Sequence, residues 1–179
     1  MSETRSDDPA ATGDEAGDAS TKMGADSAEH LRIRAKDRDD LQVIAACLQD
    51  ALVPLREMAY MADEQRFLAA FNRFRWECLV DPGECADLTL CQSVLRIDHV
   101  DSVQYRGLDS ELDGVKFELL TIQVDPQESG FHVTLLFAGD VALRLQVTEL
   151  AVMLQDFGEP WPAGVAPNHD LADISRSGA

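Results

Sequence analysis

The stretch FHVTLLFAGDVALRLQV, residues 131–147, determines the fold class that the sequence predicts. Large apolar residues recur at every second position on both sides of the tripeptide AGD, namely at Phe131, Val133, Leu135, Phe137, Val141, Leu143, Leu145 and Val147. A period of two residues places such side chains on one face of a β-strand. The stretch therefore predicts an antiparallel hairpin with one buried face.

A second hairpin is predicted upstream, where PLREMAYM (54–61) and RFLAAFNRFRWE (66–77) flank the polar tetrapeptide ADEQ. Further strands are indicated at residues 31–35, 91–108 and 115–124, which also alternate.

Two segments follow a helical period instead. In residues 37–52 one face of a helix carries Leu41, Ile44, Ala45, Leu48 and Leu52, and Asp37 is suited to cap its first turn. In residues 148–158 the helical spacing is that of Leu150, Met153, Leu154 and Phe157, with Gly158 suited to the C-cap. The order of elements predicts an α+β fold, with a curved, mainly antiparallel sheet of about six to seven strands and two helices. One helix follows the first strand and the other is C-terminal. A barrel like that of pleckstrin-homology domains is a topology compatible with this order.

The segment FNRFRWE (71–77) raises the question of which side chains face the core. In a strand, Asn72, Phe74 and Trp76 share one face, and Phe71, Arg73, Arg75 and Glu77 share the other. Aromatic side chains bury large apolar areas, so we expect Phe74 and Trp76 in the core and the arginines facing outward.

Arginines alternate with apolar residues in several predicted strands, at Arg32, Arg34, Arg73, Arg75, Arg96 and Arg144. If their polar faces coincide, they form an anion site, because guanidinium groups bind carboxylates and phosphates in a bidentate manner. The alternative is a solvated sheet face whose arginines pair with nearby acids such as Glu57, Asp98 and Glu118. The candidate ligand-binding residues are Arg73, Arg75, Arg96 and Arg144, together with His169 and Asp170 of the C-terminal segment PNHDL.

The chain of 179 residues has a net charge of −18, and the charge is unevenly distributed. Residues 1–30 hold eight acidic and two basic residues and almost no large apolar ones, which predicts a disordered tail. We expect a single globular domain at 31–158, followed by an irregular tail at 159–179 that partly packs on it. An acidic protein repels phosphate groups, so binding to nucleic acid or to an anionic membrane is not expected.

Motifs for common chemistries are missing from the sequence, which contains no G-x-S-x-G, Walker A or G-x-G-x-x-G pattern. The cysteines Cys47, Cys78, Cys85 and Cys91 form no C-x-x-C pair, and the four histidines lack metal-ligand spacing. We therefore expect no metal, no cofactor and no catalytic residue. The N-terminus carries no export signal and the chain no membrane span, which predicts reduced thiols and a cytoplasmic location.

Several segments together resemble an alphaproteobacterial family known as domain of unknown function number twenty-nine forty-eight. They are LRIRAKDRDDLQVIAACLQDALVPLREMAY, RFLAAFNRFRWE, VLRIDHVDSVQYRGL, LLTIQV, VTLLFAGDVALRLQVTELAVMLQDFG and PNHDL. The resemblance spans about residues 31–171 and implies a small cytoplasmic bacterial protein. It implies no activity, substrate or catalytic residue.

Two hypotheses for function follow. The first is a non-enzymatic binding or protein-interaction module, whose partner is a protein. The second is an enzyme or a protein that binds a small anionic ligand, with a site near the arginine-bearing sheet face and the PNHDL segment. The sequence leaves the oligomeric state open.

Overall fold

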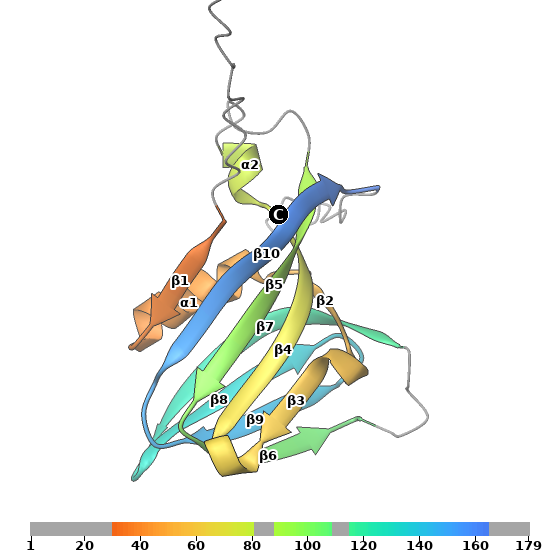
Figure 1. Cartoon of the computed structure of the whole chain (residues 1–179). Helices are drawn as coiled ribbons and strands as arrows, with labels where there is room; N and C mark the ends of the chain where they lie inside the picture. The colour runs from red at the N-terminus through yellow and green to blue at the C-terminus, as the bar shows by residue number, and fades with distance from the viewer. Residues whose placement is uncertain (1–29, 81–87, 109–114, 165–179) are drawn as a thin grey trace, which may run out of the picture.

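The computed structural model describes residues 30–80, 88–108 and 115–164. Within these ranges the chain forms one sheet of ten strands, every pair of which is antiparallel (Figure 1). The strands are β1 (Arg32–Ala35), β2 (Leu52–Pro54), β3 (Met58–Met61), β4 (Arg66–Phe74), β5 (Thr89–Asp98), β6 (Val100–Arg106), β7 (Lys116–Gln127), β8 (Gly130–Phe137), β9 (Ala142–Val147) and β10 (Val152–Pro162). The helical elements are α1 (Arg38–Cys47), the short α2 (Glu77–Val80) and the 3-10 turns η1 (Leu55–Glu57) and η2 (Ala62–Glu64).

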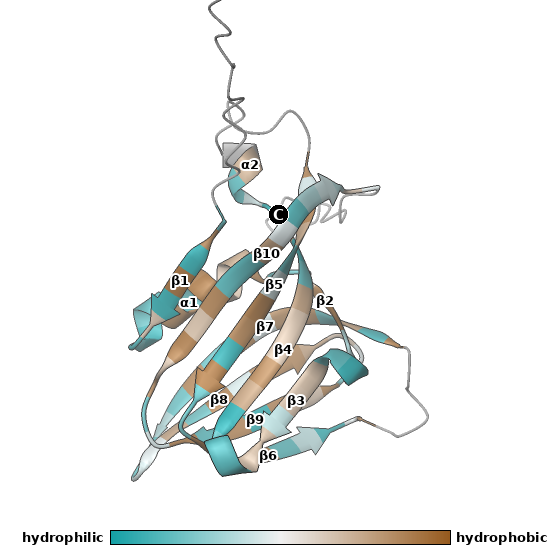
Figure 2. Ribbon diagram, viewed as in Figure 1, coloured by the Kyte–Doolittle hydropathy of each residue, from teal (hydrophilic) through white to brown (hydrophobic). Residues whose placement is uncertain are grey.

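The sheet folds into two layers (Figure 1). Its strand order is β1-β10-β5-β4-β2-β7-β8-β9-β6, and β3 pairs with the first four residues of β4. The short β2 leads from the first layer to the second. The apolar inner faces of both layers form one buried core, which is visible as the brown stripes in Figure 2.

The hairpin predicted at residues 131–147 is confirmed. β8 pairs with β9 from Phe131 opposite Val147 to Leu136 opposite Ala142. The alternating residues Val133, Leu135 and Leu145 are fully buried, as the period of two requires. The hairpin predicted at residues 54–77 is confirmed in its central part, where β3 pairs with residues 66–69 of β4 across η2. Residues 55–57 form η1 and Glu77 begins α2, so the predicted arms are too long.

The predicted α+β class is wrong, because the described residues form ten strands and only one helix longer than four residues. The predicted C-terminal helix is β10, which pairs with both β1 and β5. Apolar residues at 150, 152 and 154 also satisfy a period of two, and these three are the buried ones. Gly158 adopts a φ of +68° beside the register shift between Phe157 and Trp161, so it serves a β-bulge and no helix C-cap.

Helix α1 forms in the predicted segment but ends at Cys47, and Leu52, which was predicted on its apolar face, begins β2 instead. The Asp37 side chain accepts a 2.9 Å hydrogen bond from the backbone N–H of Asp40, and Leu41, Ile44 and Leu48 point into the core. In Figure 1 α1 lies between β1, at one end of the sheet, and β7 in the second layer. The helix thus covers the core on the side where these two strands do not pair.

The other side of the sandwich is joined by side chains. The Tyr60 hydroxyl lies 3.1 Å and 2.9 Å from the carbonyl oxygens of Val100 and Asp101, and Gln65 donates to the Asp101 carboxylate at 3.1 Å. β10 continues to Pro162, past the domain boundary predicted at residue 158. The predicted disorder of the N-terminal tail concerns residues outside the described ranges, as do the predictions for Cys85, His169 and Asp170.

Candidate functional site

The Arg73 side chain is fully buried, with 0% of its surface exposed. Along β4 the residues at 67, 69, 71 and 73 all point into the core. The prediction that Arg73 faces outward is therefore wrong. Side chains of β4 do alternate between two faces, as predicted. However, the face that carries Phe71 points into the core, and Arg73 lies on that same face.

The guanidinium of Arg73 has all five of its N–H donors satisfied. Nε and one terminal nitrogen donate to the two oxygens of Asp156 at 2.9 and 2.7 Å. The terminal nitrogens also donate to both oxygens of Glu77 at 3.0 and 2.8 Å, and one donates to the carbonyl of Phe74 at 3.1 Å. A guanidinium with five donors in use has none left for a ligand.

Asp156 has further partners that extend this network. It accepts hydrogen bonds from the Ser93 hydroxyl and, at 3.3 Å, from the backbone N–H of Leu31. We call Arg73, Glu77, Ser93 and Asp156 the Arg73 cluster. It connects β4, β5 and β10 with α2 and with the residue that precedes β1, so its role is structural.

The charged groups of the Arg73 cluster stabilise one another's ionised forms. Burial alone would raise the pKa of Asp156, but hydrogen bonds from Arg73 and Ser93 outweigh burial and lower it. The pKa of Glu77 is lowered in the same way, by Arg73 against the effect of burial. Burial alone would lower the pKa of Arg73, but its hydrogen bonds to Asp156 and Glu77 outweigh burial and raise that pKa above its usual value.

Stability should therefore fall in acid. A carboxyl group whose pKa is lower in the folded than in the unfolded protein contributes stability above its unfolded pKa, and that contribution is lost as the pH falls. Asp156 and Glu77 are such groups, and so is Asp98 because of its hydrogen bonds from Arg96 and Arg66. We expect the urea midpoint to decrease steadily from about pH 5 down to about pH 2. A midpoint that is constant or rises over this range would contradict the assignment.

The thiols near the Arg73 cluster are poor nucleophiles. Burial raises the pKa of Cys91 to about 11 and also raises the pKa of Cys47, so both remain protonated at neutral pH. Cys47 and Cys91 are free, whereas Cys78 is disulfide-bonded. The prediction of reduced thiols is wrong at Cys78.

Trp76 and Arg75 lie where the chain leaves β4. The Trp76 ring is half-buried, 5.3 Å from the ring of Phe74, and its Nε1–H donates to the carbonyl of Gln49 at 3.1 Å. Phe74 is buried as predicted, but Trp76 is only partly a core residue. Nε of Arg75 lies 3.5 Å from Oε1 of Glu77, with which it forms an ion pair.

The predicted arginine face forms only in part. Arg34, Met153 and Arg96 are register neighbours on β1, β10 and β5, and together with Arg32 they line a shallow depression. Arg144 is exposed on β9, which belongs to the second layer. The ligand-binding role predicted for Arg75, Arg96 and Arg144 stays a prediction.

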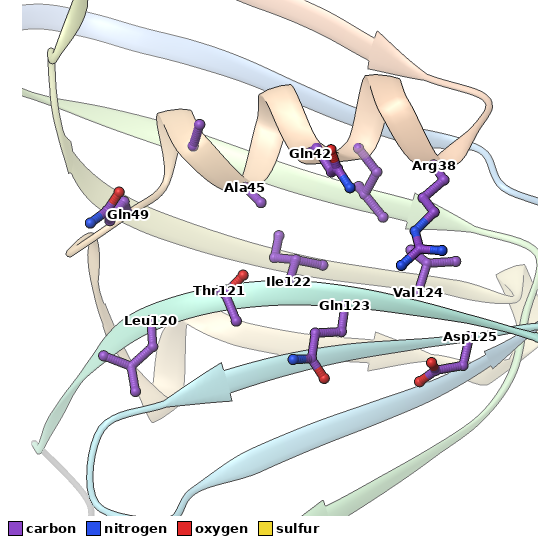
Figure 3. A pocket seen from close by; sticks show the side chains of 12 residues that line it. Arg38, Gln42, Ala45, Gln49, Leu120, Thr121, Ile122, Gln123, Val124 and Asp125 are labelled. Atoms are coloured by element: carbon purple, nitrogen blue, oxygen red, sulfur yellow. The ribbon is translucent and has the colours of Figure 1, made fainter.

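A groove of about 550 Å³ lies between α1 and β7 (Figure 3). One wall is a face of α1 and the turn that follows it, and the other is a run of six consecutive residues of β7; the lining comprises Arg38, Leu41, Gln42, Ala45, Ala46, Gln49 and residues 120–125. Figure 3 shows Ile122 and Val124 pointing toward the helix and Gln123 and Asp125 pointing away. Alternate strand residues point to opposite faces, so a groove that meets all six must run along the edge of the strand.

This edge of β7 is open beside α1. β2 pairs only with residues 116–118, and the backbone of Leu119 bonds to Ala51 and Asp50. Beyond Leu119, no backbone hydrogen bond joins this edge to another segment of the described chain, while the opposite edge pairs with β8 as far as Gln127. In an antiparallel strand the backbone groups of alternate residues point to the same edge. Within the described chain, the groove therefore presents N–H and C=O groups that have no backbone partner, although the carbonyl of Asp125 accepts a 3.4 Å hydrogen bond from the Gln127 side chain.

Comparison with known families agrees with the resemblance seen in the sequence. The sequence profile of the family described as "Protein of unknown function (DUF2948)" matches residues 31–169. The chain belongs to this family. The match covers all of the described elements of the DUF2948 domain, including both walls of the groove and the Arg73 cluster.

The remaining comparisons add no relative, since no curated protein and no solved structure matches the chain. In the part of the chain that the structure describes, no three His, Cys, Asp or Glu side chains gather as metal ligands would. None of the helices in the described ranges has both the length and the apolar composition needed to cross a bilayer.

Proposed function

We propose that this DUF2948 domain is a peptide-binding module in which an extended segment of a partner protein adds to the open edge of β7. The observation that carries the proposal is the combination of an unpaired strand edge with a groove walled by a helix. Addition of a strand to an exposed sheet edge is a recurrent mode of peptide recognition, in which main-chain hydrogen bonds contribute affinity and side-chain pockets contribute specificity.

The dimensions of the groove fit a short extended segment. Residues 120–125 of β7 extend over about 17 Å at the usual rise of a strand. The helix wall from Arg38 to Cys47 is about 14 Å long at 1.5 Å per residue. A segment of about five residues in β-conformation has the same length, and it supplies the alternating N–H and C=O groups that the edge lacks.

The side chains of the groove indicate the composition of the segment. Ala45, which is half-buried, and Ala46, which is exposed, offer apolar surface along the helix wall. Arg38 lies at the Val124–Asp125 end (Figure 3), and its guanidinium makes no ion pair with any described residue. An unpaired guanidinium at one end favours a carboxylate there. The segment should therefore carry apolar side chains on its helix-facing side and an acidic group near Arg38.

The second hypothesis, an enzyme or small-anion site, has less support. Arg73 has no free donor. Arg75 follows the end of β4, whereas Arg96 lies on β5 and Arg144 on β9 in the other layer. A cytoplasmic location remains part of the proposal, although the disulfide at Cys78 is unusual for a reducing compartment.

The proposal is tested by selecting peptides of about ten random residues displayed on phage against the full chain, and measuring the affinity of the enriched peptides by calorimetry. A variant that fills the groove, Ala46→Trp, should weaken binding at least about tenfold, because the indole occupies the space of the added strand. Arg38→Gln should weaken the binding of acidic peptides by about twofold to fivefold. Hydrogen exchange should show new protection of the amides in residues 120–125.

The matched control is Val43→Trp, since Val43 is 52% exposed on the same helix but does not line the groove. Its affinity should equal that of the natural chain. Equal binding by Ala46→Trp, failure to enrich any peptide, or protection outside β7 would each overturn the proposal.

A further inference from the structure

A second surface differs in charge from the rest of this acidic protein. On the outer face of β1, β10 and β5, a depression of about 280 Å³ is lined by Arg32, Arg34, Lys36 and Arg96, with Asp98 as its one acid. Its apolar floor includes Met153, which lies in register between Arg34 and Arg96. The depression carries a net charge of +3, whereas the whole chain carries −18. We call these lining residues the basic depression.

Most of the positive charge in the basic depression is uncompensated. Arg96 donates to Asp98 at 2.7 Å, and Asp98 is shared with Arg66. Arg32, Arg34 and Lys36 have side chains without an ion pair to any described residue. Three neighbouring cations that repel one another favour an anionic occupant.

A segment of complementary charge precedes Arg32 in the sequence. Residues 1–29 carry eight acidic and two basic residues, and only His30 and Leu31 separate them from Arg32. A tethered segment has an effective concentration of the order of millimolar, far above that of most free partners. We infer that the acidic segment 1–29 covers the basic depression of its own chain through ion pairs with Arg32, Arg34 and Lys36.

The lysines of the chain make this contact measurable. The sequence contains three of them, Lys22, Lys36 and Lys116, and only Lys36 lines the basic depression. A zero-length carbodiimide joins an amine to a carboxylate that it contacts. In the full chain at low salt, mass spectrometry should find Lys36 linked to acids between residues 3 and 18, at several times the yield of links from Lys116. Because exposed charges are screened within about 10 Å at 0.1 M salt and about 3 Å at 1 M, the Lys36 links should disappear in 1 M salt.

A charge variant distinguishes electrostatic attraction of the acidic segment from its closeness to Lys36 in the sequence. Arg32→Gln combined with Arg34→Gln keeps Lys36 and the tether, and should lower the yield of Lys36 links by about threefold to tenfold, as expected for two exposed ion pairs. An unchanged yield, or equal links from Lys36 and Lys116, would overturn the inference. A mixture of ¹⁵N-labelled and unlabelled chains should give links within one chain only. Mixed-label links would assign the depression to a second copy and would also overturn it.

Discussion

Replacing Arg73 with methionine should lower the free energy of unfolding by about 3–5 kcal/mol at pH 7, the usual cost of removing one partner of a buried ion pair. Methionine fills much of the space of arginine but leaves Asp156 buried without its cation. The carboxylate of Asp156 is 3% exposed, and Arg73 supplies two of its hydrogen bonds. The effect is measured by urea unfolding followed by circular dichroism.

The pH dependence distinguishes this cause from a simple loss of packing. Without Arg73, the buried Asp156 should have a raised pKa and take up a proton more readily, which removes the uncompensated charge. The difference in stability between the natural chain and Arg73→Met should therefore be largest near pH 7 and shrink toward pH 4. Arg144→Met is the control, since Arg144 is exposed on β9 and should change stability by less than about 0.5 kcal/mol. A difference that does not vary with pH would assign the loss to packing alone.

Replacing Gly130 with alanine should have the second large effect. Gly130 begins β8 at the β7–β8 turn with a φ of +97°, a conformation that costs other residues of the order of 1–3 kcal/mol. An added Cβ would also overlap the carbonyl oxygen of Val147 and lie 2.9 Å from the Cα of Thr148. Both are backbone atoms that a side-chain rotation cannot move. We therefore expect Gly130→Ala to destabilise the protein by more than about 3 kcal/mol, the strain and the overlap together.

Gly139 is the matched control. It also has a positive φ, of +77°, but a Cβ there would meet no atom within 4 Å. Gly139→Ala should therefore show the backbone strain alone, of the order of 1 kcal/mol. Equal melting temperatures for the two variants would show that β9 moves aside from residue 130.

The sequence predicted those elements whose periodicity is unambiguous. The β8–β9 hairpin has apolar residues only at a spacing of two over most of its length, and α1 has both a helical stripe and a capping aspartate. Residues 148–158 satisfied both periods, and the choice between them depends on pairing with β1 and β5, which lie far away in the chain. Local spacing alone does not contain that information.

The Arg73 cluster and the groove were missed for a related reason. Arginine side chains are seldom buried. Arg73 is buried because it contacts Asp156 in the folded chain, and the two residues are 83 positions apart in the sequence. The only indication in the sequence was Asp156, an acidic residue within the mainly apolar stretch that forms the first part of β10. The groove depends on α1 lying beside a strand more than 70 positions later, which no local pattern records.

The pairing of β1 with β10 also affects how the chain is made. Arg32 lies opposite Gln155, so the first of the described strands to leave the ribosome forms its ladder with the last of them. At about 5–20 residues per second, translation takes about 6–25 s to cover the interval between them. During that time β1 has no strand to pair with, and the Arg73 side chain lacks the aspartate that neutralises it. The complete sheet therefore forms only after β10 has been synthesised, and the growing chain depends on remaining soluble until then.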